Sequence, residues 1–296
     1  MKQRQLRADL ALLLVALIWG ATFVMVKEAV TNFPVFAFLA LRFALAFAAL
    51  LIIIWWRENS RKNKEGMPSP SLGRGAIRAG VLIGLLLFAG YAFQTVGLRY
   101  TSPGKAGFIT GLSVAIVPLF SALLLRRSPS RSAILGVTLA TVGLALLSLR
   151  DGWTIARGDA IVLGCAFAFA LHIISVGAFA PRMDTLNLTA IQIATVALVS
   201  GLISLATERP WPTASQAVCF AALFTGIFAT SLAFAVQNAA QRFTSPTHTA
   251  LIFSTEPIFA ALFSYLLAGE RLSGRGLVGC GLILTGMITA ELGKEG

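Results

Sequence analysis

Charged side chains are scarce in this chain of 296 residues. Asp, Glu, Lys and Arg together make up 12% of it, against roughly 25% in a soluble domain. The longest polar stretch, residues 57–76, is too short to fold as a domain of its own. Hydrophobic residues make up 57% of the chain. This composition excludes an ordinary soluble protein and predicts an integral membrane protein.

Candidate metal ligands and nucleophiles are also few. The chain has three cysteines and two histidines, and none has the spacing of a metal site. Cys165, Cys219 and Cys280 lie in apolar segments, where cysteine acts as a small hydrophobic residue. A phosphate-binding glycine loop and a His/Asp/Glu cluster are both missing. We therefore expect no cofactor and no direct use of ATP, and a membrane enzyme such as a lipid-modifying transferase is left only as an alternative.

Ten apolar stretches recur along the chain, each about long enough to cross a hydrocarbon core of roughly 30 Å. Backbone polar groups find no water there, so each stretch is expected to be a helix. The alternating pattern of barrel strands is absent from the sequence. In chain order, segments one to ten cover residues 8–28, 34–56, 77–98, 103–125, 132–149, 159–180, 187–207, 214–238, 246–268 and 274–291.

The sequence repeats itself internally. Residues 94–149 align without a gap onto 237–292, at an offset of 143, and sixteen of the 56 pairs are identical. At an offset of 150, segments one and two match six and seven more weakly, with Asp9 on Asp159 and Trp19 on Phe169. Each half then has five helices. Because five is odd, the second half enters the membrane from the opposite side. The predicted fold is all-α, with ten transmembrane helices in two inverted repeats, residues 1–150 and 151–296, around a central cavity.

Basic residues of the first half are unevenly distributed over this layout. Lys27, Arg99 and Lys105 fall on one side, and twelve fall on the side of the amino terminus. Cytoplasmic loops are rich in Lys and Arg, so both termini are predicted to be cytoplasmic in a bacterial inner membrane, although the second half shows no such bias. The net charge of +12 thus needs no nucleic-acid partner. The twelve are Lys2, Arg4, Arg7, Arg57, Arg61, Lys62, Lys64, Arg74, Arg78, Arg126, Arg127 and Arg131.

Several short motifs recur in a fixed order along the chain, and in that order the whole chain resembles the EamA type of the drug/metabolite transporter superfamily. The resemblance implies a ten-helix inner-membrane carrier that exports amino acids, aromatic ones among them, drugs or other metabolites. It does not fix the cargo. The motifs are Trp19-Gly20, Arg42-Phe43, the Thr-Ser-Pro triplets that start at Thr101 and Thr244, Glu256-Pro257 and Gly269-Glu270.

Polar and aromatic residues at mid-depth are the candidates for a binding site, because ionisable groups in a bilayer are costly. Glu256 lies about 16 Å into segment nine and is the only carboxylate so placed. His172 lies about 20 Å into segment six. Trp19 lies in the middle of segment one, and Tyr91 lies one turn before Gln94 in segment three. With Phe108, these residues are predicted to form the substrate-binding site, although each could instead have a purely structural role.

Three further residues are predicted to act in gating or in structure. Arg42 lies about 12 Å into segment two, where carbonyl partners or direct substrate contact could account for it. His248 lies at the start of segment nine and aligns with Lys105 in the repeat.

Ser102 and Ser245 are predicted helix caps, each followed by a proline at the first helical position. Gly136 and Gly143, like Gly279 and Gly286, share a helix face, so segments five and ten are expected to pack on each other or on a second copy.

Together these features predict a secondary transporter that exports small metabolites by alternating access, with amino acids as the first candidate cargo. Export of drugs or cationic organic compounds is the alternative, because a cation needs a counter-charge such as Glu256. The expected partners are the small-molecule substrate and the lipid bilayer, and the protein is expected to be a monomer or a homodimer.

Overall fold

The structure is a computed structural model that describes residues 2–65, 73–101, 103–126, 129–148, 157–268 and 273–292. All regular secondary structure within these residues is helical. The α-helices are α1 (Lys2–Asn32), α2 (Val35–Glu65), α3 (Arg74–Leu98), α4 (Pro103–Gly111), α5 (Ser113–Leu125), α6 (Arg131–Ser148), α7 (Arg157–Phe179), α8 (Thr185–Thr207), α9 (Gln216–Gly226), α10 (Ala233–Ala240), α11 (Pro246–Phe253), α12 (Glu256–Ala268) and α13 (Gly274–Leu292). A 3₁₀ turn, η1 (Ala180–Arg182), precedes α8, and a π-helical segment, η2 (Ile227–Leu232), joins α9 to α10.

These helices form the ten predicted segments, which confirms the predicted fold class. Among the described residues, seven helical stretches are long and apolar enough to cross a membrane, and α6 and α13 are shorter apolar helices. Segments four, eight and nine each contain two α-helices: α4 with α5, α9 with α10, and α11 with α12. The boundary predicted between residues 150 and 151 lies outside the described residues and stays a prediction.

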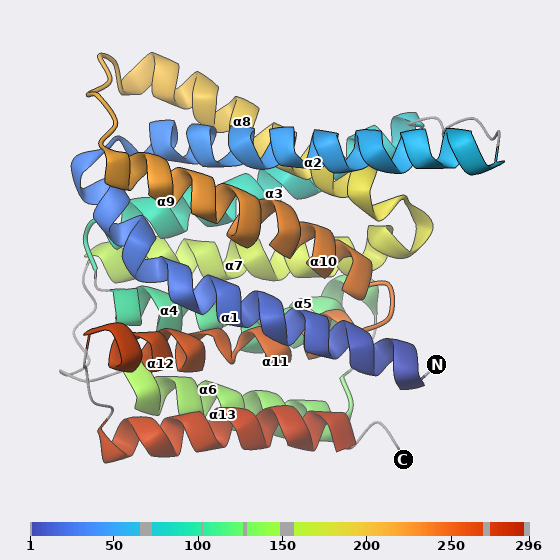
Figure 1. Cartoon of the computed structure of the whole chain (residues 1–296). Coiled ribbons are helices and arrows are strands. Elements are labelled where there is room, and N and C mark those ends of the chain that lie inside the picture. Colours follow the sequence, from blue (N-terminus) through green and yellow to red (C-terminus); the bar gives the residue numbers. More distant parts are fainter. Residues whose placement is uncertain are drawn as a thin grey trace.

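The two halves are related by an inversion that the helix contacts reveal. In Figure 1 the helices lie side by side, α1 runs away from the end marked N, and α7, its counterpart, runs toward that end. Contacts also come in equivalent sets. The contact of α3 with α7 is matched by that of α1 with α9 and α10, and the contact of α5 with α7 by that of α1 with α12. The start of α1 and the end of α13 lie at the same end of the bundle (Figure 1).

Segments four and nine are broken, where the sequence predicts continuous helices. In segment nine, α11 ends at Phe253 and α12 begins at Glu256. Pro257 has no N–H to donate to the preceding turn, and the hydroxyls of Ser254 and Thr255 donate back to the carbonyls of Leu251 and Ile252, at 2.6 and 2.7 Å. In segment four, Leu112 separates α4 from α5, at the repeat equivalent of Thr255. Both breaks therefore lie at matching mid-depth positions.

Helices α6 and α13 pack closely along a seam of glycines. A Cβ atom on Gly136 would lie 2.5 Å from the carbonyl oxygen of Gly286, and one on Gly143 would lie 2.6 Å from that of Gly279. Only glycine allows two helix backbones to approach so closely. The predicted packing of segments five and ten on each other is confirmed.

We expect Gly286→Leu to destabilise the protein and Gly281→Leu, on the same helix, to leave it stable. A side chain at 286 would meet the Gly136 carbonyl and the Ala140 amide, whereas nothing lies within 4 Å of a Cβ at the exposed Gly281. Overpacking of this kind costs about 1–3 kcal/mol. Thermal unfolding of both variants in detergent measures the difference. Equal melting temperatures would contradict the close packing of α6 on α13 at Gly286.

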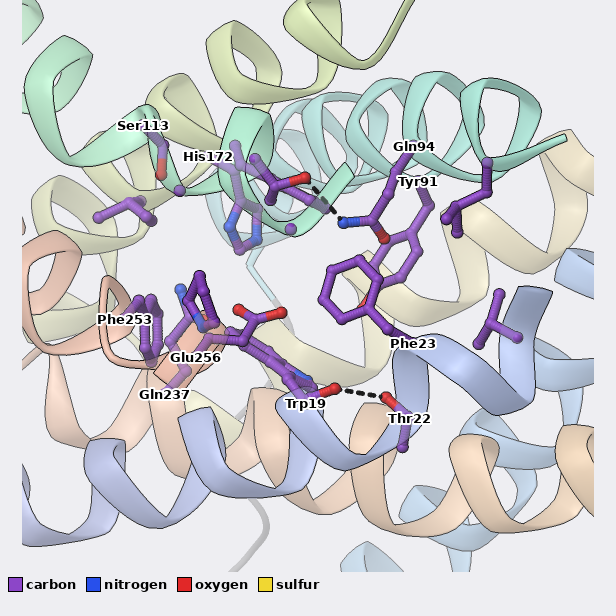
Figure 2. A pocket seen from close by; sticks show the side chains of 18 of the residues that line it. Trp19, Thr22, Phe23, Tyr91, Gln94, Ser113, His172, Gln237, Phe253 and Glu256 are labelled. Carbon is purple, nitrogen blue, oxygen red and sulfur yellow. Dashed lines mark hydrogen bonds between the residues drawn. The ribbon is translucent and has the colours of Figure 1, made fainter. Parts of the chain in front are cut away.

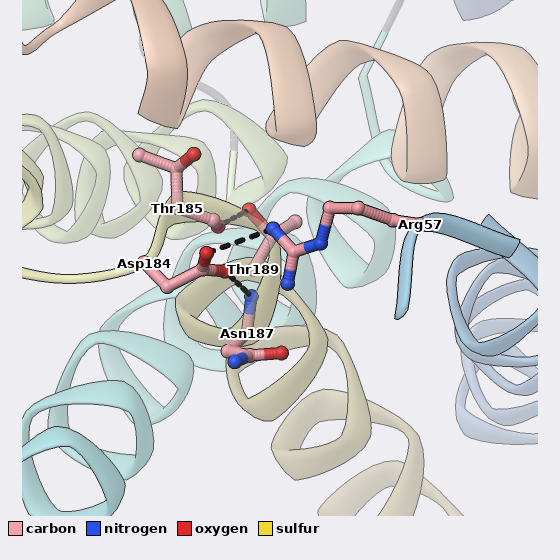
Figure 3. A network of polar contacts seen from close by, with 5 residues as sticks. All are labelled: Arg57, Asp184, Thr185, Asn187 and Thr189. Carbon is pink, nitrogen blue, oxygen red and sulfur yellow. Dashed lines mark hydrogen bonds and ion pairs between the residues drawn. The ribbon is translucent and has the colours of Figure 1, made fainter. Parts of the chain in front are cut away.

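Acidic residues hold both ends of the antiparallel pair α2 and α8. At one end, Glu208 accepts hydrogen bonds from the backbone amides of Phe36 and Ala37, at 3.0 and 2.8 Å, and so caps the start of α2. At the other end, Asp184 caps α8 by accepting from the Asn187 amide at 3.0 Å, and Arg57 donates to it at 2.7 Å (Figure 3). Partial burial alone would raise the pKa of the Asp184 carboxyl, but the Asn187 amide and the Arg57 guanidinium outweigh it, and the pKa lies below its usual range.

This lowered pKa predicts an acid-sensitive contribution to stability. A carboxyl whose pKa is depressed by folding stabilises the fold above its unfolded pKa, about 3.9 for Asp, and the contribution is lost as the pH falls through the folded value. Asp184→Asn keeps a good capping residue but removes the charge. We expect the wild type to exceed this variant in melting temperature at pH 6 and the gap to close toward pH 3. A gap independent of pH would contradict this assignment.

Candidate functional site

A cavity lies between the two halves, at the level of the helix breaks. Helices from both halves line it, and Figure 2 shows side chains from several of them pointing into one space. The volume open to the centres of water molecules is about 70 Å³. A water needs roughly 10–15 Å³ on this measure, so the cavity holds a handful of waters. Its lining includes Trp19, Thr22, Phe23, Arg42, Tyr91, Gln94, Thr110, Ser113, Phe169, His172, Ile173, Phe234, Gln237, Phe253 and Glu256.

Most of this lining consists of pairs that the internal repeat aligns. At the offset of 150, Trp19 pairs with Phe169, and at the offset of 143, continued three residues before the block that starts at Gln94, Tyr91 pairs with Phe234. The pseudo-twofold axis between the halves therefore passes through the cavity, and each wall presents related positions. Further pairs in the lining are Thr22 with His172, Phe23 with Ile173, Gln94 with Gln237, Thr110 with Phe253 and Ser113 with Glu256.

Glu256 opens α12, directly after the break in segment nine. Its carboxylate points into the space that Trp19, His172 and Tyr91 surround (Figure 2). None of the described residues forms an ion pair or a hydrogen bond with this carboxylate. Its repeat partner, Ser113, is neutral. The cavity thus has an acidic side chain on one wall only, and no described residue occupies its oxygens.

The π-helical segment η2 positions the Trp19 indole. A π-helix shifts the backbone hydrogen bonds by one residue and is frequent at functional sites. Here the indole nitrogen of Trp19 donates to the Ala229 carbonyl at 2.8 Å. The ring packs against Phe253 and Phe234, with centroids 4.8 and 5.4 Å away. Trp19 therefore forms a fixed apolar wall of the cavity.

Arg42 and Tyr91 form a second positioned group. Arg42 is only 3% exposed, and its Nε donates to the hydroxyl of Thr230, in η2, at 2.8 Å. Its Nη2 lies 3.3 Å from the Tyr91 hydroxyl, and the guanidinium lies 4.8 Å from the centroid of the Tyr91 ring. Phe43 and Phe169 pack edge-on against Tyr91, at 5.0 and 5.4 Å. The sequence left open whether Arg42 contacts carbonyl groups or substrate. In the structure its partners are hydroxyl groups and aromatic rings, and Arg42 lines the cavity.

Amides and an imidazole complete the polar lining. Gln94 donates to the Thr110 hydroxyl at 3.2 Å. His172 Nε2 lies 3.2 Å from the side-chain oxygen of Gln192, and the Gln192 amide nitrogen has no hydrogen-bond partner among the described residues. These groups can donate to and accept from a polar ligand without adding charge.

The structure brings five of the six predicted binding residues together, and it places Phe108 elsewhere. Phe108 packs against hydrophobic clusters and is not part of the lining, whereas Gly107 and Thr110 are. Residues 107, 110 and 111 share one face of α4, and position 108 is rotated by about 100° from it. Of the predicted gating residues, Arg42 lines the cavity. The backbone of Lys105 belongs to α4, but its side chain lies outside the described part of the chain.

His248 lies away from the cavity, toward the end of the bundle where α1 begins. Ser245 caps its helix, as predicted, by accepting from the His248 amide at 3.2 Å. His248 Nε2 lies 3.2 Å from the carboxylate of Asp9, in the first part of α1. In the repeat, Asp9 aligns with Asp159 and His248 with Lys105. Asp159 lies at the opposite end, where it accepts from the Thr101 hydroxyl at 2.5 Å.

Gln237 and Thr22 are two of the polar cavity residues that were not predicted from the sequence, although the repeat contains the signal for them. Gln237 is 1% exposed, donates to Gln241 at 3.0 Å, and keeps its side-chain oxygen free of described hydrogen-bond partners. It is the repeat equivalent of Gln94. Thr22 is likewise the equivalent of His172. Mapping each predicted residue through the repeat would have identified both.

This architecture, a largely apolar cavity with a few polar groups between inverted halves of a multi-pass membrane protein, is that of a transporter. The profile of the EamA-like transporter family matches residues 6–149 and 156–290. The chain belongs to this family, which confirms the resemblance to the EamA type.

Individual relatives agree with this assignment. The chain is similar to an uncharacterized transporter of Archaeoglobus fulgidus, with 34% identity over 98% of this chain and 87% of the relative. It is also similar to the uncharacterized transporter YyaM of Bacillus subtilis, with 25% identity over 92% of this chain and 89% of the relative. A solved structure described as a crystal structure of protein has the same fold, with a TM-score of 0.77 and 21% identity, over 97% of this chain and 96% of the other.

Proposed function

We propose that this transporter exports small zwitterionic metabolites, with amino acids as its cargo, by exposing the cavity to each side of the membrane in turn. The observation that carries the proposal is the Glu256 carboxylate, which faces the cavity without a described partner and is surrounded by aromatic and amide groups. Burying a carboxylate within the membrane is costly unless a ligand or a proton neutralises its charge. The ammonium group of an amino acid would neutralise it.

The size of the cavity favours a small cargo over a drug. Pockets for drug-sized ligands have volumes of about 300–1,000 Å³, well above the 70 Å³ found here. Export of small cationic compounds is the second candidate, because Glu256 would also attract an amine that lacks a carboxylate. The two differ in whether the cargo carries a negative group, which flux measurements on matched compounds distinguish.

Efflux from proteoliposomes tests the proposal. Vesicles holding the purified protein and empty vesicles are loaded with each of the radiolabelled standard amino acids in turn, and the release rates are compared. Release of a subset of small amino acids only from the protein-containing vesicles is expected. Equal release from both kinds of vesicle across the whole panel would remove the proposed cargo class.

The proposed orientation places both termini in the cytoplasm of the inner membrane. It rests on the twelve basic residues of the first half. A carboxyl-terminal fusion to alkaline phosphatase should be inactive and a fusion to green fluorescent protein should fluoresce. The reverse result would invert the orientation.

We propose that the pair of His248 and Asp9 is a gate at the terminal end of the bundle, and that Lys105 serves the equivalent gate at the other end. The contact joins the first part of α11 to the first part of α1, and both segments also contribute residues to the cavity lining. With Thr22→Cys as a reporter in the cavity, Asp9→Asn should raise the rate of labelling by a membrane-impermeant maleimide several-fold. The reporter in the otherwise unchanged protein is the control, and equal rates would contradict this gate.

A further inference from the structure

The cavity holds a second charge that the proposed function has not used. Arg42 and Glu256 both line it, and they do not form an ion pair with each other. Their repeat equivalents, Gln192 and Ser113, are neutral. The two walls therefore carry one basic and one acidic side chain, and both line the space in which a ligand would lie.

The Arg42 guanidinium has hydrogen-bond donors to spare. Arginine carries five N–H donors, and two are used by Thr230 and Tyr91. No described carboxylate forms an ion pair with it. A buried charge without a counter-ion is costly, and a structural role alone would be met by a neutral side chain that bonds to the same hydroxyls.

The guanidinium is also held in place before any ligand arrives. The ring of Tyr91 supports it at 4.8 Å and that of Phe43 at 5.6 Å, and the Thr230 hydroxyl, which itself donates to the Thr225 carbonyl at 2.9 Å, fixes its Nε. A planar fork fixed in this way matches the two oxygens of a carboxylate. Pre-organisation lowers the entropic cost of binding.

We infer that Arg42 binds the carboxylate of the cargo while Glu256 binds its ammonium group, so that the site selects small molecules that carry both charges. The inference rests on the proposed function and deepens it, because it assigns each charged group of an amino acid to one wall. Thr230 and Tyr91 are positioning residues for Arg42. The lining positions are related in pairs by the pseudo-twofold axis, but Arg42 and Glu256 differ from each other. The cargo therefore binds in a single orientation.

Binding of three matched probes tests the inference. L-valine carries both charges, 3-methylbutanoate only the carboxylate, and isobutylamine only the ammonium. Thermal shifts in detergent at constant ionic strength give the binding of each. Arg42→Gln should weaken binding of the carboxylate probe by about tenfold or more and leave the amine probe unchanged, and Glu256→Gln should do the opposite. Arg57→Gln, on the same helix but in contact with Asp184, is the matched control and should change neither.

Several outcomes would overturn the assignment. One is that the wild-type protein does not bind 3-methylbutanoate. Another is that the Arg42→Gln protein binds it as tightly as the wild type. If Arg42→Gln does not fold, Arg42→Lys keeps the charge without the planar fork, and it should still weaken carboxylate binding several-fold with the amine unaffected; an equal loss for both probes would count against the assignment. Because binding and not flux is measured, failure here is distinguishable from failure of amino-acid efflux.

Discussion

Glu256→Gln is expected to lower the efflux of the proposed amino-acid cargo by about 100-fold. The amide keeps the shape of the carboxylate but removes the only acidic group that lines the cavity among the described residues. Truncating one member of a buried, hydrogen-bonded charge pair costs about 2–5 kcal/mol, and each 1.4 kcal/mol is about a factor of ten. Radiolabelled efflux from proteoliposomes, with protein content matched, gives the ratio of rates.

Ser113→Ala is the matched control for this experiment. Ser113 lines the same cavity at the repeat equivalent of Glu256, and its loss removes a hydroxyl but no charge. We expect its efflux rate to stay within about threefold of the wild type. Wild-type efflux from the Glu256→Gln protein would show that the carboxylate does not bind the cargo. A selective loss of cationic cargo, with zwitterions unaffected, would favour the second candidate function.

Gly20→Ala is expected to destabilise the protein and to abolish most of its transport. A Cβ at position 20 would lie 2.7 Å from the carbonyl oxygen of Glu256 and 2.8 Å from the amide nitrogen of Ala260. These are backbone atoms of α12, so α1 and α12 would have to separate. Overpacking costs about 1–3 kcal/mol. Because Trp19 and Glu256 flank this contact, the same movement would displace both from the cavity.

Gly201→Ala tests whether the effect comes from the contact or from the loss of a glycine. The nearest atom to a Cβ at Gly201, in α8, is the Ala40 Cβ at 3.9 Å, an ordinary van der Waals distance. This variant is expected to be as stable as the wild type or more stable by about 0.4–1 kcal/mol, because alanine restricts the unfolded chain. Melting temperatures and efflux rates of the two variants answer the question, and equal behaviour would contradict a close approach at Gly20.

The helical segments and their inversion could be predicted because neither depends on contacts between side chains. Apolar length defines each segment, and an odd number of segments per half determines the inversion. Trp19, Tyr91 and Glu256, chosen for their depth, lie together around the cavity. For these three residues depth was sufficient because the cavity lies at the middle of the bundle.

The rest depended on rotation about helix axes and on contacts between distant segments. Phe108 is at a suitable depth, but the face of α4 that reaches the cavity contains Gly107 and Thr110 instead. The environment of Arg42 depends on Thr230, 188 residues away, in a π-helical segment that hydrophobic periodicity does not reveal. For the same reason the ligand-facing role of Arg42 emerges only from the assembled cavity.

The paired walls of the cavity limit how its charges could arise. A carrier made of two identical, separately encoded halves would hold two copies of every lining side chain, so an acid such as Glu256 would occur twice and the two carboxylates would repel each other across a small space. Joining the halves in one polypeptide lets each position change alone. The solitary acid opposite Ser113 and the solitary base opposite Gln192 are arrangements that a carrier of two identical halves cannot have.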